Sequence, residues 1–253
     1  MTGRTILEAS RLDAPPGPKY ANLERAAGQE ILAVHRRGKF LVAPLSAGDE
    51  LVIHLGMTGT ITPEEPASHA RARVKLSAGA NPDLYFRDVR RFGRFLVTKA
   101  CDYQLVPSLG TLGPEPLSSQ FTASAFHQAL KQSRVPLKTY LLSQRPVAGL
   151  GNIYADEALY HARISPLIEA HRISKRRAAR LRDAIREVLA GALEAQGTTL
   201  SDYRTVAGQL GSFSTWLNVY GREGTPCPRC RTIIAKVTLA ARSTHYCPRC
   251  QRR

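Results

Sequence analysis

Four cysteines near the end of the chain constrain its fold more than any other feature. Cys227 and Cys230 form one Cys-x-x-Cys pair, Cys247 and Cys250 form a second, and sixteen residues separate the pairs. Four soft thiolates from two tight turns match the tetrahedral preference of zinc, and the intervening length suits one β-hairpin. The spacing therefore predicts a β-hairpin ribbon that holds one structural zinc ion per chain and performs no catalysis itself.

Two disulfides are the alternative for the same cysteines, and they would need an oxidising compartment. The chain opens with no charged-then-apolar signal segment, and no apolar run approaches a membrane span. We therefore expect a cytoplasmic, bacterial protein with reduced thiols and no membrane partner. The fifth cysteine, Cys101, has no partner in sequence and is expected to be a small apolar filler.

The balance of charge points to a polyanionic partner. The 253 residues carry 36 Lys and Arg against 20 Asp and Glu, a formal net charge of +16. Residues 222–253 alone hold eight basic residues against one acid, Glu223. Such a chain attracts phosphate at long range, with an affinity that falls steeply as salt rises.

The pattern of apolar residues changes along the chain. Short alternating runs between residues 30 and 99 predict antiparallel strands in a sandwich or barrel, and from about residue 121 the period is helical. One helix is predicted to begin after an N-cap at Ser174 and to stop at Gly197. The Gly-, Pro- and Ser-rich stretch SLGTLGPEPLSSQ separates the halves. We therefore predict an α+β fold with a β-sandwich domain at 1–115, a helical domain at 116–221 and the ribbon at 222–253.

Several short motifs lie on this framework. RRGKF (36–40) follows a strand pattern, HLGMTG (54–59) ends one, and DVRRFG (88–93) is predicted within a third. In GLGNIYADEAL two glycines lead into a helix that is predicted to begin near Asn152. The free N–H groups and positive dipole of such a helix start can grip a phosphate. An ordinary helical hairpin with Asn152 as a simple N-cap is the alternative.

Taken together with LGPEPL (112–117) and the cysteine ribbon, these motifs closely resemble the formamidopyrimidine-DNA glycosylase family of base-excision repair enzymes. The resemblance runs from about Gly3 to the C-terminus. It implies an N-terminal antiparallel β-sandwich, a helix-two-turn-helix domain and the zinc ribbon. It also implies a monomer whose partner is duplex DNA with oxidised purines or abasic sites. The implied activity is excision of the base (DNA glycosylase) followed by strand cleavage (AP lyase).

The resemblance also implies roles for single residues. Met57, Arg90 and Phe92 match the residues that fill the space left by an extruded nucleotide and bond its orphaned partner base. Lys39, Asn152 and Arg242 match phosphate contacts, His54 matches a DNA-contacting histidine, and Glu157 matches a support of the active site; Tyr220 is expected to be structural. From residue type alone, Met57 and Phe92 would more often lie in a core, and the cations would be solvated.

The family's catalytic groups are a terminal proline, whose amine attacks the sugar, and a following glutamate. Here the first residues, MTGRTILEAS, resemble the family's stretch after its first helix, and we identify no nucleophile in the chain. Three alternatives would explain this: a misassigned or truncated start, a natural non-enzymatic DNA-binding protein, or a substitute amine at Thr2. Lys39, with an ordinary pKa of about 10, is a weak nucleophile and a supporting residue only.

Two further functions compete with an oxidised-purine glycosylase that is impaired as written. One is a non-catalytic damaged-DNA-binding zinc protein. The other is an RNA-binding or ribosomal zinc-ribbon protein, which would explain the charge and the cysteines but not HLGM combined with RRF.

Overall fold

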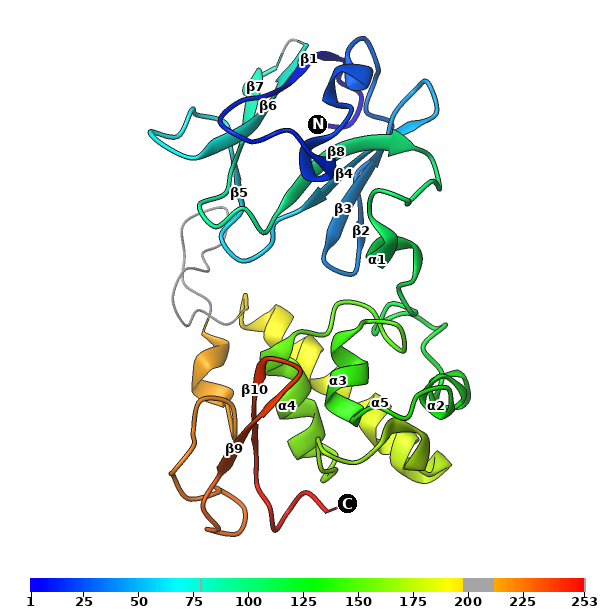
Figure 1. Ribbon diagram of the computed structural model, residues 1–253, viewed down its shortest axis with the longest axis vertical. Helices are drawn as coiled ribbons and strands as arrows, with labels where there is room; N and C mark the ends of the chain where they lie inside the picture. The colour runs from blue at the N-terminus through cyan, green and yellow to red at the C-terminus, as the bar shows by residue number, and fades with distance from the viewer. Residues whose placement is uncertain (78, 198–211, 253) are drawn as a thin grey trace. The chain divides into compact units, whose positions relative to one another are not determined.

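The computed structural model describes residues 1–77, 79–197 and 212–252, and the chain forms two compact units, Met1–Thr111 and Leu112–Arg253 (Figure 1). We describe each unit by itself. The predicted three-domain division at 1–115, 116–221 and 222–253 stays a prediction, and part of its middle domain lies outside the described residues.

The first unit contains two four-stranded antiparallel sheets (Figure 1). One has the order β1-β6-β7-β5, with β1 at Ile6–Arg11, β6 at Ala70–Leu76, β7 at Asp83–Arg87 and β5 at Thr60–Thr62. The other has the order β2-β3-β4-β8, with β2 at His35–Arg37, β3 at Phe40–Pro44, β4 at Asp49–His54 and β8 at Arg94–Lys99. Short 3-10 helices, η1 (Pro18–Tyr20) and η2 (Leu23–Ala26), follow β1, and α1 (Pro107–Gly110) follows β8.

Apolar side chains from both sheets share one core, which makes this unit a β-sandwich. Ile6 and Val74 come from the first sheet, Leu51 comes from the second, and all three are fully buried. Phe86 of β7 stacks on Phe95 of β8 with ring centroids 5.5 Å apart, so the two sheets meet through aromatic packing. The predicted antiparallel sandwich is confirmed.

One local prediction for this unit is wrong. DVRRFG does not lie within a strand: β7 ends at Arg87 and β8 begins at Arg94, so residues 88–93 form the connection between them. Arg91 has a positive φ of 56°, a left-handed conformation that no regular strand contains.

The second unit begins with helices. They are α2 (Ala123–Lys131), α3 (Leu137–Leu142), α4 (Asn152–His161), η3 (Ala170–Arg172), α5 (Lys175–Glu194) and η4 (Phe213–Trp216). The predicted N-cap of α5 is confirmed, because the Ser174 hydroxyl accepts a hydrogen bond from Arg177 N. Its apolar face, with Leu181 and Ile185 fully buried, packs into the core of this unit. Gly197 adopts φ 93° beyond the helix end and donates to Ala192 O at 2.7 Å.

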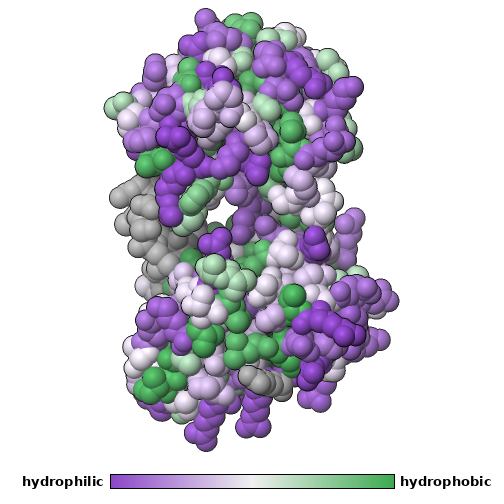
Figure 2. All heavy atoms as spheres, in the orientation of Figure 1, coloured by the Kyte–Doolittle hydropathy of each residue, from purple (hydrophilic) through white to green (hydrophobic). Residues whose placement is uncertain are grey.

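The ribbon follows the helices within the same unit. Strands β9 (Ala235–Leu239) and β10 (Arg242–Tyr246) form an antiparallel hairpin between the two cysteine pairs, as the spacing predicted. Ala240 and Ala241 connect them, both at positive φ. Among the described helices, none has the length and apolar character to span a bilayer. Figure 2 shows hydrophilic residues spread over the visible face of each unit, with smaller apolar areas among them.

Candidate nucleic-acid interface and zinc centre

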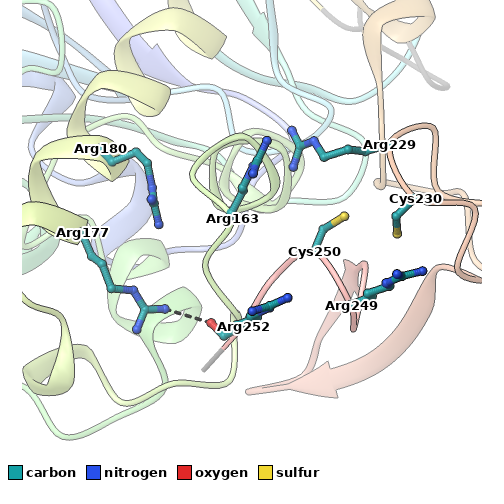
Figure 3. A pocket seen from close by; sticks show the side chains of 8 residues that line it. All are labelled: Arg163, Arg177, Arg180, Arg229, Cys230, Arg249, Cys250 and Arg252. Carbon is teal, nitrogen blue, oxygen red and sulfur yellow. Dashed lines mark hydrogen bonds between the residues drawn. The ribbon is translucent and has the colours of Figure 1, made fainter.

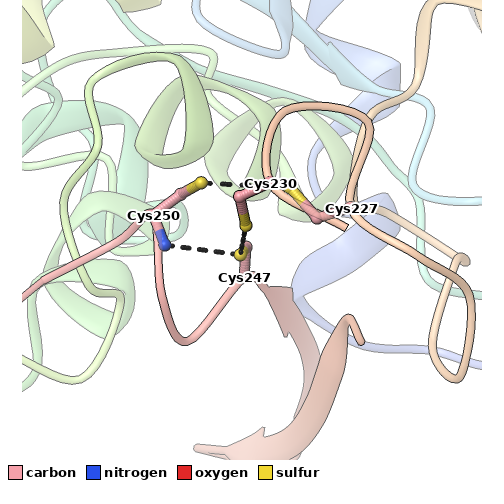
Figure 4. Close-up of side chains that lie close together, drawn as sticks. All are labelled: Cys227, Cys230, Cys247 and Cys250. Atoms are coloured by element: carbon pink, nitrogen blue, oxygen red, sulfur yellow. Dashed lines mark hydrogen bonds between the residues drawn. The ribbon is translucent and has the colours of Figure 1, made fainter. Parts of the chain in front are cut away.

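The four cysteines meet at one point of the second unit (Figure 4). Their Sγ atoms all lie within 4.8 Å of one another, with Cys230 to Cys247 at 3.5 Å and Cys227 to Cys250 at 4.0 Å. Thiolates 2.3 Å from a tetrahedral zinc ion are about 3.8 Å apart, so the donor set fits zinc in number, chemistry and spacing. All four positions are filled by protein ligands, which is the arrangement of a structural ion rather than a catalytic one.

The second cysteine turn is fastened to the helical part of the unit. Cys250 N donates to the Cys247 sulfur at 3.3 Å, and Cys247 N donates to the Gln251 side chain at 2.7 Å. The side-chain nitrogen Nε2 of Gln251 donates in turn to Ile164 O, beyond the end of α4. Tyr160 of α4 places its hydroxyl 3.6 Å from the Cys227 sulfur. Zinc binding therefore fixes the ribbon against α4 as well as closing the ribbon itself.

Two loops of the first unit are joined by one buried carboxylate. We call residues 55–59 and 88–93 the paired loops. The side chain of Asp88 is fully buried and accepts from the Thr58 hydroxyl at 2.7 Å and from Gly93 N at 2.7 Å. The Thr58 hydroxyl oxygen also accepts from Arg90 N at 3.1 Å. A change at Asp88 would therefore reach both loops.

Two glycines let the paired loops approach each other. A Cβ added to Gly56, which has φ 67°, would lie 2.7 Å from Gly93 N and from the Phe92 carbonyl carbon. A Cβ on Gly93 would lie 2.6 Å from the Phe86 ring and 2.8 Å from His54 O. A side chain at Gly56 would push the loops apart, and one at Gly93 would displace the Phe86 ring or the end of β4.

The three predicted lesion-contacting residues all lie on the paired loops. Met57 and Phe92 are 60% and 50% exposed, so the alternative that they are core residues is wrong. The Arg90 guanidinium lies over the Phe92 ring, 4.9 Å from its centroid. Large exposed apolar side chains on loops that are held by hydrogen bonds are typical of a surface that contacts a partner.

His54 lies at the end of strand β4 and Lys39 lies in a turn of the same sheet. His54 ends β4, its ring packs on Phe40 at 4.7 Å, and its Nδ1 accepts from Gly56 N at 3.2 Å. Burial, followed by the charges of Lys39 and Arg94, lowers the pKa of His54. The neutral ring therefore supports the loop that carries Met57. Lys39 is exposed at the tight connection between β2 and β3.

In the second unit, the start of α4 lies against the ribbon. Gly151 is the N-cap of α4 and no side chain caps the helix, so Asn152 is its first residue rather than its cap. Asn152 Nδ2 reaches the Ser243 hydroxyl at 3.5 Å, one residue after Arg242. Arg242 is exposed at the start of β10. The N–H groups of the first turn of α4 and two predicted phosphate contacts thus lie close together.

A buried ion pair fixes β10 to the helices. Lys138 of α3 and Asp156 of α4 are both fully buried, with Nζ and Oδ1 2.7 Å apart. Lys138 Nζ also donates to Ser243 O at 2.7 Å and to the Thr244 hydroxyl at 3.0 Å. Asp156 Oδ2 accepts from His245 N at 2.9 Å. The pair therefore sets the position of the strand that begins with Arg242.

Glu157 has a similar role one residue later. Its fully buried carboxylate accepts from the backbone N–H groups of Asn218, Val219 and Tyr220, each at 2.9 Å. It holds the segment that enters the ribbon. Tyr220 packs its ring on His245 at 5.0 Å, in keeping with the structural role expected for it.

Sequence reasoning missed Asp88, Lys138 and Asp156. Each is a buried charged residue, but the sequence holds no short-range signal that pairs Lys138 with β10. The predicted site residues fall into two groups, one on each unit. Lys39, His54, Met57, Arg90 and Phe92 lie on the first, and Asn152, Arg242 and the four cysteines on the second. Their roles toward DNA stay predictions.

Three family models match the chain. The formamidopyrimidine-DNA glycosylase N-terminal domain matches residues 1–95, the formamidopyrimidine-DNA glycosylase H2TH domain matches 112–204, and a zinc finger found in FPG and IleRS matches 224–253. The last match agrees with the geometry of the four cysteines: the chain has a four-cysteine zinc finger with one structural zinc site.

Known proteins match over almost the whole chain. A formamidopyrimidine-DNA glycosylase of Thermus thermophilus is 50% identical over 251 residues, 98% of this chain and 91% of that protein. The crystal structure of the MutM (Fpg) protein from the same organism matches with a TM-score of 0.88 at 48% identity, covering 99% of this chain and 92% of that one. A structure of MutM in complex with carbocyclic 8-oxo-G containing DNA matches with a TM-score of 0.84 at 32% identity, covering 100% and 94%. This chain belongs to the formamidopyrimidine-DNA glycosylase family.

Proposed function

We propose that this protein recognises oxidised purines, such as formamidopyrimidine and 8-oxoguanine, and abasic sites in duplex DNA, within the DNA glycosylase and AP lyase function of its family. The observation that carries the proposal is the exposed group on the paired loops, Met57, Arg90 and Phe92. Relatives with the same fold include one solved with 8-oxo-G containing DNA.

Extruding a damaged nucleotide from the stack costs a few kcal/mol and leaves a gap between base pairs. A flexible methionine and a flat phenylalanine can fill that gap with apolar surface, and an arginine can hydrogen-bond the base left without a partner. Asp88 and the two loop glycines support this group, because they hold the two loops against each other before DNA arrives. Less ordering is then needed on binding.

Two of the three proposed phosphate contacts, Asn152 and Arg242, lie on the second unit. The first turn of α4 has no capping side chain, and its N–H groups together with Asn152 Nδ2 can donate to phosphate oxygens. Arg242 adds a cation on the adjacent strand. The net charge of +16 adds long-range attraction. Lys39 and His54 are proposed as further contacts to DNA from the first unit.

The chemistry of strand cleavage needs an amine at the sugar carbon and a group that moves protons. In the family these are a terminal proline and a glutamate, and none of the 253 residues is matched to either. For these 253 residues we therefore propose recognition of the lesion with little or no cutting. A non-catalytic damaged-DNA-binding zinc protein is the second candidate, because the exposed group Met57, Arg90 and Phe92 would serve lesion recognition equally without cutting.

The test separates binding from chemistry. The zinc-loaded chain is titrated with duplexes that contain an abasic site, 8-oxoguanine or undamaged guanine, with structured RNA as competitor. Preference for the damaged duplexes is expected, whereas equal binding to all three duplexes, or tighter binding to the RNA, would refute the recognition proposal.

Borohydride trapping on the abasic duplex then tests the chemistry. We expect no covalent adduct with the 253 residues and a strong adduct when Pro-Glu-Leu-Pro-Glu-Val-Glu and a first helix are added in front. A strong adduct without the extension, mapped to Thr2 or Lys39, would show that a substitute amine serves. No adduct with the extension would favour the non-catalytic candidate.

A further inference from the structure

Six arginines of the second unit surround one cavity of about 710 Å³ (Figure 3). We call it the arginine pocket, and its arginines are Arg163, Arg177, Arg180, Arg229, Arg249 and Arg252. They come from four places: the end of α4, the first turns of α5, and the two cysteine turns. Among the described residues, the other lining residues are Cys230 and Cys250, and no acidic side chain of the described ranges lines the cavity.

These charges are not compensated within the part of the chain that the structure describes. Among the described residues, no carboxylate forms an ion pair with any of the six arginines. Arg177 donates to Arg252 O at 2.9 Å, and Arg229 lies over the Tyr160 ring at 4.3 Å. Both contacts orient a guanidinium and neither supplies negative charge. Burial and then the charge of Arg180 lower the pKa of Arg177, which is the effect of cations held close together.

The charges in the first turn of α5 are unfavourable to the helix dipole. Lys175, Arg176 and Arg177 occupy its first turn, which contains no acid. The N-terminal end of a helix carries positive partial charge, so acidic residues stabilise it and cations destabilise it. Folding alone does not favour this arrangement. An anion bound in front of the turn would reverse the sign of the interaction.

The zinc site does not account for the pocket. Four thiolates and one zinc ion carry a net charge of about −2, which is less than the charge of the six arginines. Cys230 and Cys250 lie at one side of the cavity, whereas Arg177 and Arg180 lie at the other, on α5 (Figure 3). The arginines of the helix have no sulfur partner among the contacts of the described residues.

We propose that the arginine pocket binds a compact oligophosphate, of the class of a nucleoside triphosphate or inorganic polyphosphate. Arginine is the side chain best suited to phosphate, because its planar fork donates two parallel hydrogen bonds to two oxygens. The six arginines line one open hollow from several sides, which suits a small ligand of high charge that several guanidinium groups can contact at once. A duplex presents its phosphates along an extended convex surface and needs a stripe of cations instead.

Calorimetry with tripolyphosphate tests the proposal on the zinc-loaded 253-residue chain, with zinc content measured afterwards because polyphosphates chelate metals. One site per chain is expected. The variant Arg180→Ala/Arg249→Ala removes two exposed pocket arginines whose side chains make no hydrogen bond among the described contacts. Its affinity should fall at least about tenfold. The matched control Lys175→Ala/Arg176→Ala removes two charges from the first turn of α5, outside the pocket lining, and its affinity should fall less than about threefold at physiological salt.

Arg242→Ala distinguishes the pocket from the ribbon surface proposed for DNA. Tripolyphosphate affinity should be nearly unchanged in that variant. Equal losses in the pocket variant and the control, or the largest loss in Arg242→Ala, would overturn the assignment. A pocket variant that weakens duplex binding as much as tripolyphosphate binding would make the pocket part of a nucleic-acid surface, and would also overturn it. Duplex binding by the unaltered chain is measured separately, so failure of the proposed DNA function leaves this result intact.

Discussion

Replacing Asp88 by Ala should separate recognition of the lesion from general affinity for DNA. Asp88 and Thr58 join the paired loops by side-chain hydrogen bonds, and the Asp88 carboxylate does so from a fully buried position. Its removal leaves the buried Gly93 N–H without an acceptor and frees the Thr58 hydroxyl, which accepts from Arg90 N. Met57 and Phe92 would then lose their common support.

The magnitude follows from the two bonds. A hydrogen bond to a charged group contributes about 1.5–3 kcal/mol, and a buried donor left unpaired costs about 1–3 kcal/mol. The Thr58 hydroxyl is only half-buried and can turn to water, so most of the loss comes from Gly93. We expect the first unit to lose about 3 kcal/mol of unfolding free energy, a large share of the 5–15 kcal/mol typical of a domain.

Two measurements check this prediction. Hydrogen exchange in increasing urea reports the stability of β7 and β8, with Asp102→Ala, an exposed acid in the same unit, as the matched control. Competition between abasic and undamaged duplexes reports discrimination, which should fall at least about tenfold, or 1.4 kcal/mol. Affinity for undamaged duplex should change little, because Asn152 and Arg242 are untouched. Intact discrimination in a destabilised variant would refute the claim that Asp88 supports the contact surface.

Removing zinc with a chelator should unfold the ribbon while the first unit keeps its hydrogen-exchange protection, and should weaken binding to damaged and undamaged duplex alike. Lys138→Met should lower the stability of the second unit by about 3–5 kcal/mol, because Asp156 stays buried without its partner, whereas Lys138→Met/Asp156→Leu should recover most of it in urea unfolding. The pKa of His54 in the folded chain lies below the ordinary value of 6.5, so the unfolded chain binds a proton at higher pH than the folded chain does. The first unit should therefore have its full stability above pH 6.5 and lose stability as pH falls through the folded-state pKa of His54. His54→Gln should flatten that part of the stability profile. Ala241→Gly should stabilise the ribbon by about 1 kcal/mol in thermal unfolding, since φ is 59° there.

Short-range signals explain which parts of the structure the sequence predicts well. The zinc site depends on ligand spacing within two turns, and the start of α5 depends on a serine three residues before the amide it caps. The sandwich follows from alternation along single strands, which does not require knowing which strands pair. Each of these can be evaluated within about twenty residues, close to the range over which local propensity acts.

Long-range contacts explain the rest. Lys138 meets Ser243 across 105 positions, and Thr58 meets Asp88 across 30, and nothing in the intervening sequence specifies either contact. The predicted strand at DVRRFG failed for the same reason. The segment lies between two runs with a strand pattern, but the buried carboxylate of Asp88 holds it as a loop against residues 55–59. Tertiary contacts decided the backbone conformation there.

Two departures from good local design lie beside surfaces assigned to anions. A two-residue hairpin turn with both φ values positive normally uses Asn-Gly, yet Ala240 and Ala241 occupy it next to Arg242, where a left-handed alanine costs about 1–2 kcal/mol. Cations fill the first turn of α5, where acids would stabilise it, next to the arginine pocket. Selection for stability alone would favour Asn-Gly in the hairpin turn and acids in the first turn of α5. The coincidence of the two departures with Arg242 and with Arg177 and Arg180 is the pattern expected where binding rather than folding determines the residue.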